Sequence, residues 1–345
     1  MSQDHTLTLL LNKIQHETET SLWIADEHAA NLEYCHANPS VSVISNRFDV
    51  AEKLRKQGWH SDFSDLDCKA IKDASLSRVY FRLAKEKPLV HHIFNQAARL
   101  LKPGGELIIT GGKQQGIKNY AKNAARCLAG KAKVKKHGSD YLATITRGEQ
   151  PPAKLDDKNY PELRPTQHYN GVDILSKPGQ YGWDKLDQGS ALLAEQFKQL
   201  AITAPTEILD LGCGYGLLSL AAHQQWPSAQ IDATDNNAAA LLSCRANFKQ
   251  QGIVGEVIAD NCAASILKQY SLLLCNPPFH QGFSVEYSLT EQFISAARRL
   301  CHPSGCALFV VNAFIPLENI ATRHFKKITL LNSDGHFKLF HLSVR

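Results

Sequence analysis

The segment at 274–279, Leu-Cys-Asn-Pro-Pro-Phe, combines residue types that could hold a planar group carrying an amine. The apolar run Ser271–Cys275 predicts a buried strand, and the two prolines end it because neither can donate to a sheet ladder. Asn276 therefore falls at the carboxyl end of a strand, where open α/β sheets bind ligands. The oxygens of Asn276 and Pro277 can accept hydrogen bonds from the amine, and Phe279 offers a flat apolar face. Taken alone, the segment is equally consistent with a proline-rich loop after a core strand.

A second segment, Asp-Leu-Gly-Cys-Gly-Tyr-Gly at 210–216, follows the predicted strand Glu207–Leu211 and opens a predicted helix. Gly212, Gly214 and Gly216 let the backbone turn tightly and approach a ligand, with helix N–H groups nearby. A dinucleotide fingerprint requires the spacing G-x-G-x-x-G, so this spacing disfavours a nicotinamide cofactor. With Asp210 before it, the loop suits a cofactor that has no pyrophosphate.

Acidic residues follow the next two predicted strands. Asp235 comes about twenty residues after the loop, where a carboxylate would accept hydrogen bonds from two ribose hydroxyls. Asp260 and Asn261 close the following strand and are placed to hydrogen-bond an adenine amine. A helix cap or a turn would explain each acid alone, and it is the favoured explanation for Asp260 and Asn261 taken singly. The glycine loop, Asp235 and the pair Asp260 and Asn261 stand at three successive strand ends, and together they favour one ligand site.

Strands and helices alternate along both halves of the chain, which predicts α/β domains with doubly wound sheets. Four prolines between 150 and 168 predict an extended linker at 151–168, between a domain at 1–150 and a second at 169–345. A helix, a Pro-Gly turn and a strand near 97–108 recur two hundred residues later, so we expect the halves to be copies of one fold unless the similarity arose by chance. The first half has no glycine-rich turn after its first strand, and we predict no cofactor site there.

The composition limits the classes of protein to which this chain can belong. The 43% hydrophobic and 21% charged residues are ordinary globular values. The nine cysteines include no C-x-x-C pair, which favours a reducing cytosol and predicts no metal site. The first residues lack the charged start and apolar core of a signal peptide, and no apolar run approaches membrane length, so we expect a cytoplasmic protein away from membranes.

Positive charge is concentrated in the first half, where 22 Lys and Arg face 16 Asp and Glu within residues 1–150. A run without any acid predicts a surface that contacts nucleic-acid phosphates, or else a solvated face kept for solubility. Three of its residues recur every four positions and share one helix face. The run comprises Lys113, Lys118, Lys122, Arg126, Lys131, Lys133, Lys135 and Lys136.

The loop at 210–216, Asp235 and Asp260 resemble the S-adenosylmethionine site of Rossmann-like class I methyltransferases. Asn-Pro-Pro-Phe at 276–279 resembles the Asn/Asp-Pro-Pro-aromatic motif of those that methylate exocyclic or amide nitrogens. A basic, cofactor-less N-terminal copy before an active copy with Asn-Pro-Pro-Phe-His-Gln-Gly is similar to the bacterial 16S ribosomal RNA guanine-N2 methyltransferases. The segments 186–190 and 312–316 also look like that group, and the resemblance covers roughly residues 205–343.

The resemblance implies two tandem Rossmann-like class I methyltransferase domains, of which the N-terminal one lacks a cofactor site and supports RNA binding. It implies methylation of N2 of one guanine, guanine 1207 of 16S ribosomal RNA, within the small subunit or its precursor, by a monomer that binds S-adenosylmethionine. The site residues that it implies are, for catalysis, Asn276, Pro277 and Phe279, and for the cofactor, Asp210, Gly212, Gly214, Gly216, Asp235, Asn236, Asp260, Asn261 and Asn276. The basic run, and not the resemblance, predicts the RNA contacts, which are Lys113, Lys118, Lys122, Arg126, Lys131 and Lys133.

Other substrates share these motifs. The 23S ribosomal RNA guanine-N2 enzymes have much of the same pattern, and Asn-Pro-Pro-aromatic also serves adenine N6 and protein glutamine methylation. The basic run favours RNA over protein but does not separate guanine from adenine. A non-enzymatic ribosome-assembly protein that binds RNA is a further alternative, against which the intact glycines, Asp235 and Asn276 argue.

Overall fold

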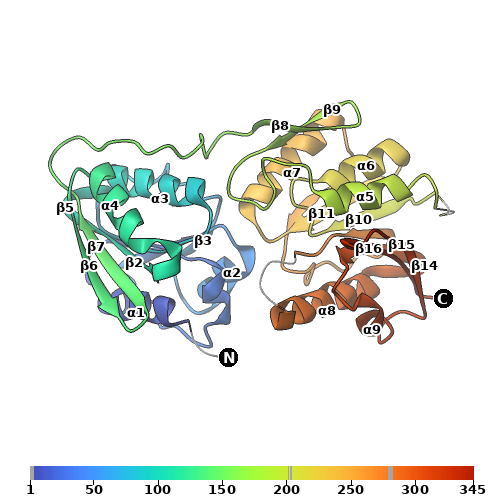
Figure 1. The fold of residues 1–345 in the computed structure, drawn as a ribbon, viewed down its shortest axis with the longest axis horizontal. Helices are drawn as coiled ribbons and strands as arrows, with labels where there is room; N and C mark the ends of the chain where they lie inside the picture. Colours follow the sequence, from blue (N-terminus) through green and yellow to red (C-terminus); the bar gives the residue numbers. More distant parts are fainter. Residues whose placement is uncertain (1–3, 201, 203, 279–282) are drawn as a thin grey trace. The chain divides into compact units, whose positions relative to one another are not determined.

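The computed structural model describes residues 4–200, 202, 204–278 and 283–345, with side chains described for the last range from Ser288 onward. The chain divides into two compact units, Met1–Glu162 (unit 1) and Leu163–Arg345 (unit 2). Figure 1 labels most of their helices and strands. The termini of the chain belong to different units, so each unit is built from one continuous stretch of sequence.

Unit 1 is built around a seven-stranded sheet in the order β3-β2-β1-β4-β5-β7-β6. The first five strands in this order are parallel, and β7 is antiparallel to both β5 and β6. Its elements are α1 (His5–Ile14), β1 (Ser21–Ile24), η1 (Glu27–Asn31), β2 (Val41–Ser45), α2 (Phe48–Lys56), β3 (Ser61–Phe63), β4 (Leu76–Arg82), α3 (Lys87–Leu100), β5 (Leu101–Gly112), η2 (Lys113–Gln115), α4 (Ile117–Cys127), β6 (Lys131–His137) and β7 (Asp140–Thr146).

Unit 2 has a seven-stranded sheet in the order β12-β11-β10-β13-β14-β16-β15, preceded by a separate hairpin of β8 and β9. Its elements are β8 (Arg164–Tyr169), β9 (Val172–Ser176), α5 (Gln188–Gln196), β10 (Glu207–Leu211), α6 (Leu217–Gln225), β11 (Gln230–Asp235), α7 (Ala238–Gln251), β12 (Val257–Ala259), β13 (Tyr270–Cys275), α8 (Phe283–Leu300), β14 (Cys301–Asn312), α9 (Leu317–Ala321), β15 (Lys327–Ser333) and β16 (Phe337–Ser343).

The two sheets have the same topology, strand for strand. The bounds of β5 and β14 lie two hundred residues apart at both ends, which is the spacing of the repeat in the sequence. The prediction of two α/β domains that are copies of one fold is therefore confirmed.

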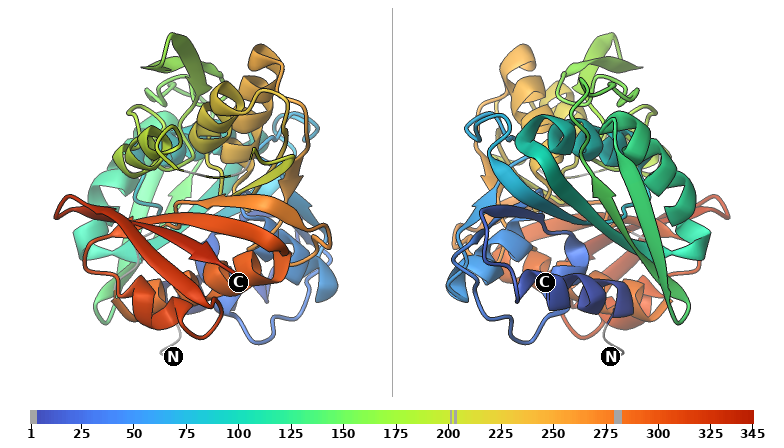
Figure 2. Two further views of the ribbon diagram at one scale, coloured as in Figure 1. Left: turned by 90° about the vertical axis from the view of Figure 1, so that its right-hand side faces the viewer. Right: turned by 90° about the vertical axis from the view of Figure 1, so that its left-hand side faces the viewer.

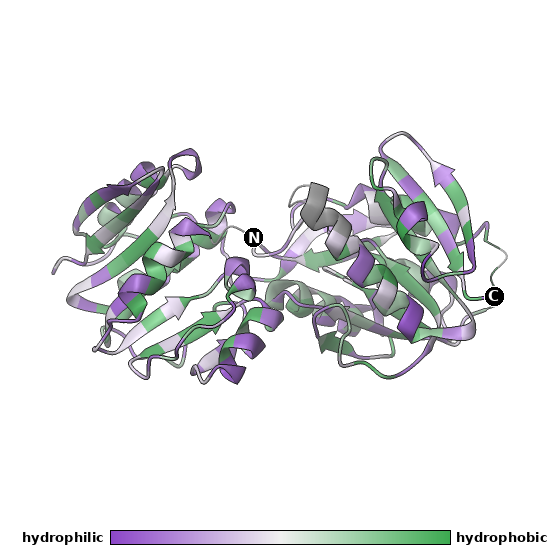
Figure 3. Ribbon diagram, turned by 90° about the horizontal axis from the view of Figure 1, so that it is seen from below, coloured by the Kyte–Doolittle hydropathy of each residue, from purple (hydrophilic) through white to green (hydrophobic). Residues whose placement is uncertain are grey.

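Helices cover both faces of each sheet because alternate strand residues point to opposite sides. In unit 1, α1 and α2 pack on one face and α3 and α4 on the other. In unit 2, α5, α6 and α7 share one face, and α8 and α9 the other. Figure 2 shows each sheet between its helices, and Figure 3 shows apolar colouring along many strands with polar colouring mainly on helices and loops. Such two-sided burial is typical of largely parallel sheets.

The predicted linker at 151–168 is divided between the two units. Leu155 and Tyr160 are buried in the core of unit 1, where the Leu155 carbonyl accepts from Asn95 Nδ2 at 3.0 Å and Tyr160 stacks on His92. The strand β8 then begins at Arg164 in unit 2. Prolines do favour an extended backbone here, but an extended segment that carries Leu and Tyr can still pack against a domain.

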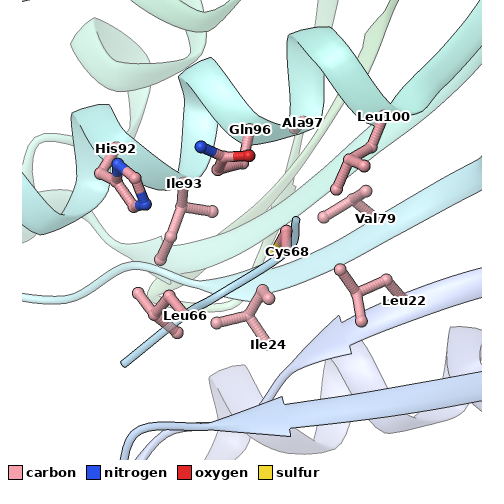
Figure 4. A pocket seen from close by; sticks show the side chains of 10 residues that line it. All are labelled: Leu22, Ile24, Leu66, Cys68, Val79, His92, Ile93, Gln96, Ala97 and Leu100. Atoms are coloured by element: carbon pink, nitrogen blue, oxygen red, sulfur yellow. The ribbon is translucent and has the colours of Figure 1, made fainter. Parts of the chain in front are cut away.

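The interior of unit 1 contains a cavity of about 10 Å³ between α3 and the sheet. Figure 4 shows its lining, in which side chains from α3, such as Ile93 and Leu100, face Leu22, Ile24 and Val79 of the strands. Its volume is that of about one water molecule. This cavity therefore has no room for a cofactor.

Candidate functional site

Three adjacent strands of unit 2 bring the predicted site residues to one edge of the sheet. Leu211 at the end of β10 pairs with Thr234 of β11 on one side and with Cys275 of β13 on the other. The residues that come next along these strands are Gly212, Asp235 and Asn276. The register therefore places the glycine loop between a carboxylate and an amide, at the carboxyl edge where such sheets bind ligands.

The glycine loop has the backbone that its spacing predicts. Gly212, Gly214 and Gly216 all have left-handed conformations, with φ of 80°, 55° and 90°. Nothing lies within 4 Å of the position that a Cβ on Gly214 would take, whereas a Cβ on Gly216 would lie 3.0 Å from Cys244 Sγ. Gly214 thus borders open space, and Gly216 packs closely against α7 as α6 begins.

Asp235 is held at the end of β11 by two backbone donors. Its Oδ2 accepts from the N–H of Gly214 at 3.0 Å, and its Oδ1 accepts from the N–H of Asn237 at 2.8 Å. The half-buried carboxylate of Asp235 lies beside the open space at Gly214, and a carboxylate oxygen can accept more than one hydrogen bond. This arrangement fits a ribose diol, which supplies two hydroxyl donors.

Asp210 lies beneath the loop and not at its surface. The side chain is buried, and its carboxylate accepts from the N–H and the hydroxyl of Ser219 at 3.0 and 2.6 Å. Burial raises the pKa of Asp210 to about 7, although the two hydrogen bonds from Ser219 act in the opposite direction. We infer that Asp210 shapes the loop and the start of α6, a different role from the predicted cofactor contact.

The predicted residues after β12 form a compact turn. Asn236 Nδ2 donates to Asn261 Oδ1 at 3.1 Å, so the ends of β11 and β12 are joined. The buried Asp260 accepts from the N–H of Asn261 at 2.6 Å and from the N–H of Ser265 at 2.8 Å. The carboxylate of Asp260 therefore stabilises the turn, as expected for this residue taken singly. Asn236 and Asn261 are then the polar side chains at these two strand ends that could contact a ligand.

Asn276 lies at the end of β13 with its amide group fixed. Its Nδ2 donates to Asp187 Oδ1 at 2.6 Å and to Ser190 Oγ at 2.9 Å. Pro277, which follows, is buried, and Pro278 is exposed. Phe279, the predicted stacking residue, lies outside the described residues, so its role stays a prediction.

Asp187 and Ser190 were given no individual role on the basis of the sequence. Asp187 is the N-cap of α5, and its Oδ1 also accepts from the N–H of Ser190 at 2.7 Å. An aspartate before an apolar helical stretch is a recognisable cap signal. The cap could therefore have been predicted from sequence, but its contact with Asn276 joins residues 89 positions apart and has no local signature.

The same strand ends in unit 1 carry different side chains. In β1, Ile24 pairs with Ile44 and Phe81 as Leu211 pairs with Thr234 and Cys275 in β10. Counting from these pairs, Trp23 stands where unit 2 has Asp210, Ser45 where it has Asp235, and Arg82 where it has Asn276. The buried Arg82 forms ion pairs with Asp4 and Asp26 at 3.4 and 3.3 Å. At these strand ends unit 1 thus has ion pairs, whereas unit 2 has side chains that can accept hydrogen bonds from a ligand.

The predicted basic residues gather on neighbouring elements of unit 1. Lys118, Lys122 and Arg126 are exposed along α4, and Lys131 and Lys133 are exposed on the edge strand β6. The right-hand view of Figure 2 shows α4 beside the β6–β7 hairpin, in agreement with their many contacts. Lysines alternate with Ala132 and Val134 along β6, but every residue from Lys131 to Lys136 is exposed, so this edge strand has no buried face.

Within the part of the chain that the structure describes, no three or more His, Cys, Asp or Glu side chains gather as metal ligands would. None of the described helices combines the length and the apolar character that crossing a membrane requires.

Comparison with known proteins gives consistent matches over both units. Residues 5–157 match the methyltransferase small domain N-terminal model, and residues 171–341 match the methyltransferase small domain model. The chain is 31% identical over 309 residues to the ribosomal RNA small subunit methyltransferase C of Pseudomonas aeruginosa strain UCBPP-PA14, covering 84% of this chain and 90% of that one. It is 27% identical over 320 residues to the protein of the same name from Shewanella amazonensis, covering 92% and 91%.

A solved structure supports the fold of the whole chain. The T. thermophilus 16S rRNA N2 G1207 methyltransferase (RsmC), solved with AdoMet and guanosine, superposes with a TM-score of 0.82 at 21% identity. The match covers 99% of this chain and 92% of that one. The fold is accordingly that of two tandem class I methyltransferase domains.

Proposed function

The chain belongs to the family of the ribosomal RNA small subunit methyltransferases C, and from this premise we propose that it methylates N2 of a guanine in 16S ribosomal RNA. The methyl donor is S-adenosylmethionine, bound by unit 2. The finer assignment, guanine 1207 within the small subunit or its precursor, rests on the family to which the chain belongs. We propose that unit 1 binds RNA and no cofactor.

One observation carries the proposal: Gly212, Asp235 and Asn276 lie side by side at the carboxyl edge of one sheet. Gly214 leaves space beside a carboxylate that can accept ribose hydroxyls, so the residues fit the nucleoside part of S-adenosylmethionine. The acceptor of Asn276 comes from the neighbouring strand. The methyl donor and the amine that receives the methyl group can therefore bind at the same edge of the sheet.

The residues of the chain contribute mainly by positioning. S-adenosylmethionine, when bound, supplies an electrophilic methyl group. A guanine exocyclic amine is a poor nucleophile because its lone pair is delocalised into the ring. The oxygens of Asn276 and Pro277 would accept hydrogen bonds from the two amine protons, which localises the lone pair on nitrogen and aims it. Such preorganised polar groups act without rearranging during the reaction.

The base must leave any helix in which it is paired to reach this edge. We propose that Phe279 then stacks on it, since aromatic side chains bind the faces of unpaired bases. The described chemistry requires no dedicated general base close to Asn276.

Nucleoside analysis tests the substrate directly. We expect purified protein and methyl-labelled S-adenosylmethionine to produce N2-methylguanosine in 16S ribosomal RNA, offered either free or in small subunits. Mass spectrometry of the digested RNA identifies the nucleoside, and protected-fragment mapping gives its position. Label in 23S RNA, in N6-methyladenosine or in protein glutamine would replace the proposed substrate by one of the alternatives, and no label at all would favour a non-enzymatic role.

The basic surface, defined as Lys113, Lys118, Lys122, Arg126, Lys131 and Lys133, supports a role of unit 1 in RNA binding. Its residues lie on η2, α4 and β6, which are consecutive elements. The corresponding edge strand of unit 2, β15, has the sequence Lys-Ile-Thr-Leu-Leu-Asn-Ser, with one lysine, whereas β6 has four. The charge is therefore a feature of unit 1 and not of the repeated fold.

Removing Lys118, Lys122 and Arg126 together is expected to weaken RNA binding without changing S-adenosylmethionine affinity. Each phosphate contact that is lost should reduce the slope of log affinity against log salt by about one unit. Filter binding at several salt concentrations measures the slope. The matched control replaces Lys13, Lys56 and Lys72, three exposed lysines elsewhere on unit 1. Equal slopes for the two triple variants would mean that the surface serves solubility.

A further inference from the structure

We propose that Asp187 and Ser190 form a clamp that fixes the amide of Asn276 with its oxygen, and not its NH₂ group, facing the substrate amine. This inference rests on the proposed function and adds two positioning residues to it. Neither side chain needs to touch the substrate, because both act through Asn276.

The clamp is needed because an asparagine amide is nearly symmetric in shape. Its oxygen and its NH₂ group occupy similar volumes, so packing alone does not choose between two orientations related by a half turn. Only hydrogen-bond partners choose. An ionised carboxylate can only accept, so the 2.6 Å contact with Asp187 Oδ1 requires the NH₂ group of Asn276 on that side. The Ser190 hydroxyl accepts the second NH₂ proton at 2.9 Å, so both NH₂ protons are used and Oδ1 is the end of the amide that can accept from a substrate amine.

Asp187 is itself held in place by two further hydrogen bonds. Its Oδ1 caps α5 through the N–H of Ser190, and its own N–H donates to the hydroxyl of Tyr215 in the glycine loop at 2.9 Å. Between the two clamp residues, Gly189 approaches Asn276 so closely that a Cβ there would lie 3.3 Å from Nδ2. The start of α5 therefore connects the glycine loop to the amide of Asn276 through short contacts.

Unit 1 contains the same construction without the amide. Asp4 is the N-cap of α1 and accepts from the N–H of Leu7, three residues on, as Asp187 accepts from that of Ser190. Its other carboxylate oxygen contacts Arg82, the counterpart of Asn276. A capping aspartate that reaches the end of the central strand is thus part of the repeated fold. In unit 2 the partner is an amide, and the same contact orients an acceptor.

The charge of Asp187 has a second consequence. A carboxylate that accepts a hydrogen bond from the NH₂ group shifts electron density within the amide toward its oxygen. The amide oxygen becomes more negative, since hydrogen bonds in a chain polarise one another. The amine gains positive charge as it attacks the methyl group. A more negative acceptor binds that charge more tightly in the transition state than in the ground state, so the clamp should appear in the rate and not in binding.

Replacing Asp187 by alanine should slow single-turnover methylation about tenfold or more, in line with the loss of a hydrogen bond to a charged group. Affinities for S-adenosylmethionine and RNA should stay within about twofold. The matched control is Asp4→Ala, which removes the equivalent cap in unit 1 and should lower thermal stability without changing the rate. Ser190→Ala keeps the cap, which uses the backbone N–H, and should slow the reaction by a smaller factor.

A double-mutant cycle decides whether Asp187 acts through Asn276. In an Asn276→Ala background, Asp187→Ala should have no further effect on the rate. An equal slowing in both backgrounds, a full rate in Asp187→Ala, or a loss of S-adenosylmethionine affinity as large as the loss of rate would overturn the clamp. The rates are compared on whichever nucleoside the wild-type protein labels, so a different substrate would refute the proposed function and leave the test of the clamp intact.

Discussion

Methylation by the Asn276→Ala variant should be slower by about 10²-fold or more, the effect of losing a preorganised polar group in other active sites. The acceptor at Asn276 matters most when the amine nitrogen attacks the methyl group. Its loss therefore raises the free energy of the transition state more than that of the ground state. Affinities for S-adenosylmethionine and for RNA should therefore change much less. Single-turnover methylation, measured beside separate binding assays, resolves the two effects.

Asn319→Ala provides the control, because this exposed asparagine lies on α9 and not on β10, β11 or β13. It should retain the wild-type rate. If Asn276→Ala also kept a near-normal single-turnover rate, the proposed role of the amide would be wrong even though the fold is right. A large fall in S-adenosylmethionine affinity would instead make Asn276 a cofactor ligand.

Loss of the Asp235 carboxylate is expected to weaken S-adenosylmethionine binding by about 10- to 150-fold, the equivalent of about 1.5–3 kcal/mol for a charge-assisted hydrogen bond. The substitution Asp235→Ala removes the proposed ribose acceptor and also frees the N–H of Gly214. Calorimetry on the full chain measures the affinity and the stoichiometry. We expect one cofactor per chain, because unit 1 has Ser45 at the corresponding position.

Asp62→Ala serves as the comparison, since this exposed aspartate lies on β3 of unit 1. Its affinity should equal that of the wild type. Two cofactors bound per chain would refute the proposal that unit 1 binds none, and an unchanged affinity in Asp235→Ala would remove the carboxylate from the site.

The sequence was most informative where chemistry constrains the backbone. Glycine at 212, 214 and 216 predicted a tight loop because few other residues adopt a left-handed conformation, and all three do. Strand ends could be placed because prolines at 277 and 278 stop a ladder. The repeat was visible because β5 and β14 kept their spacing.

Side-chain direction was harder to predict. Asp210 lies near the end of its strand and Asp260 follows its strand, as ligand-binding acids would, but their carboxylates turn inward to Ser219 in the first turn of α6 and to Ser265 in the turn after β12. The position of an acid along a strand does not reveal whether its carboxylate bonds to a local donor or to a ligand. The contact between Asp187 and Asn276 was hidden for a different reason, since it depends on how a helix packs against a sheet and not on any short pattern.

The exchange of Asp210 for Trp23 at matching positions also affects how the chain reaches its folded state. Two neighbouring domains of one topology can misfold by trading strands during synthesis, a known hazard of tandem repeats. Here β1 in the place of β10 would press an indole into the space that a small carboxylate shares with Ser219. The opposite exchange would bury an acid against the apolar residues beneath α1 and α2. The difference between Asp210 and Trp23 therefore also discourages each nascent domain from taking β1 or β10 from the other.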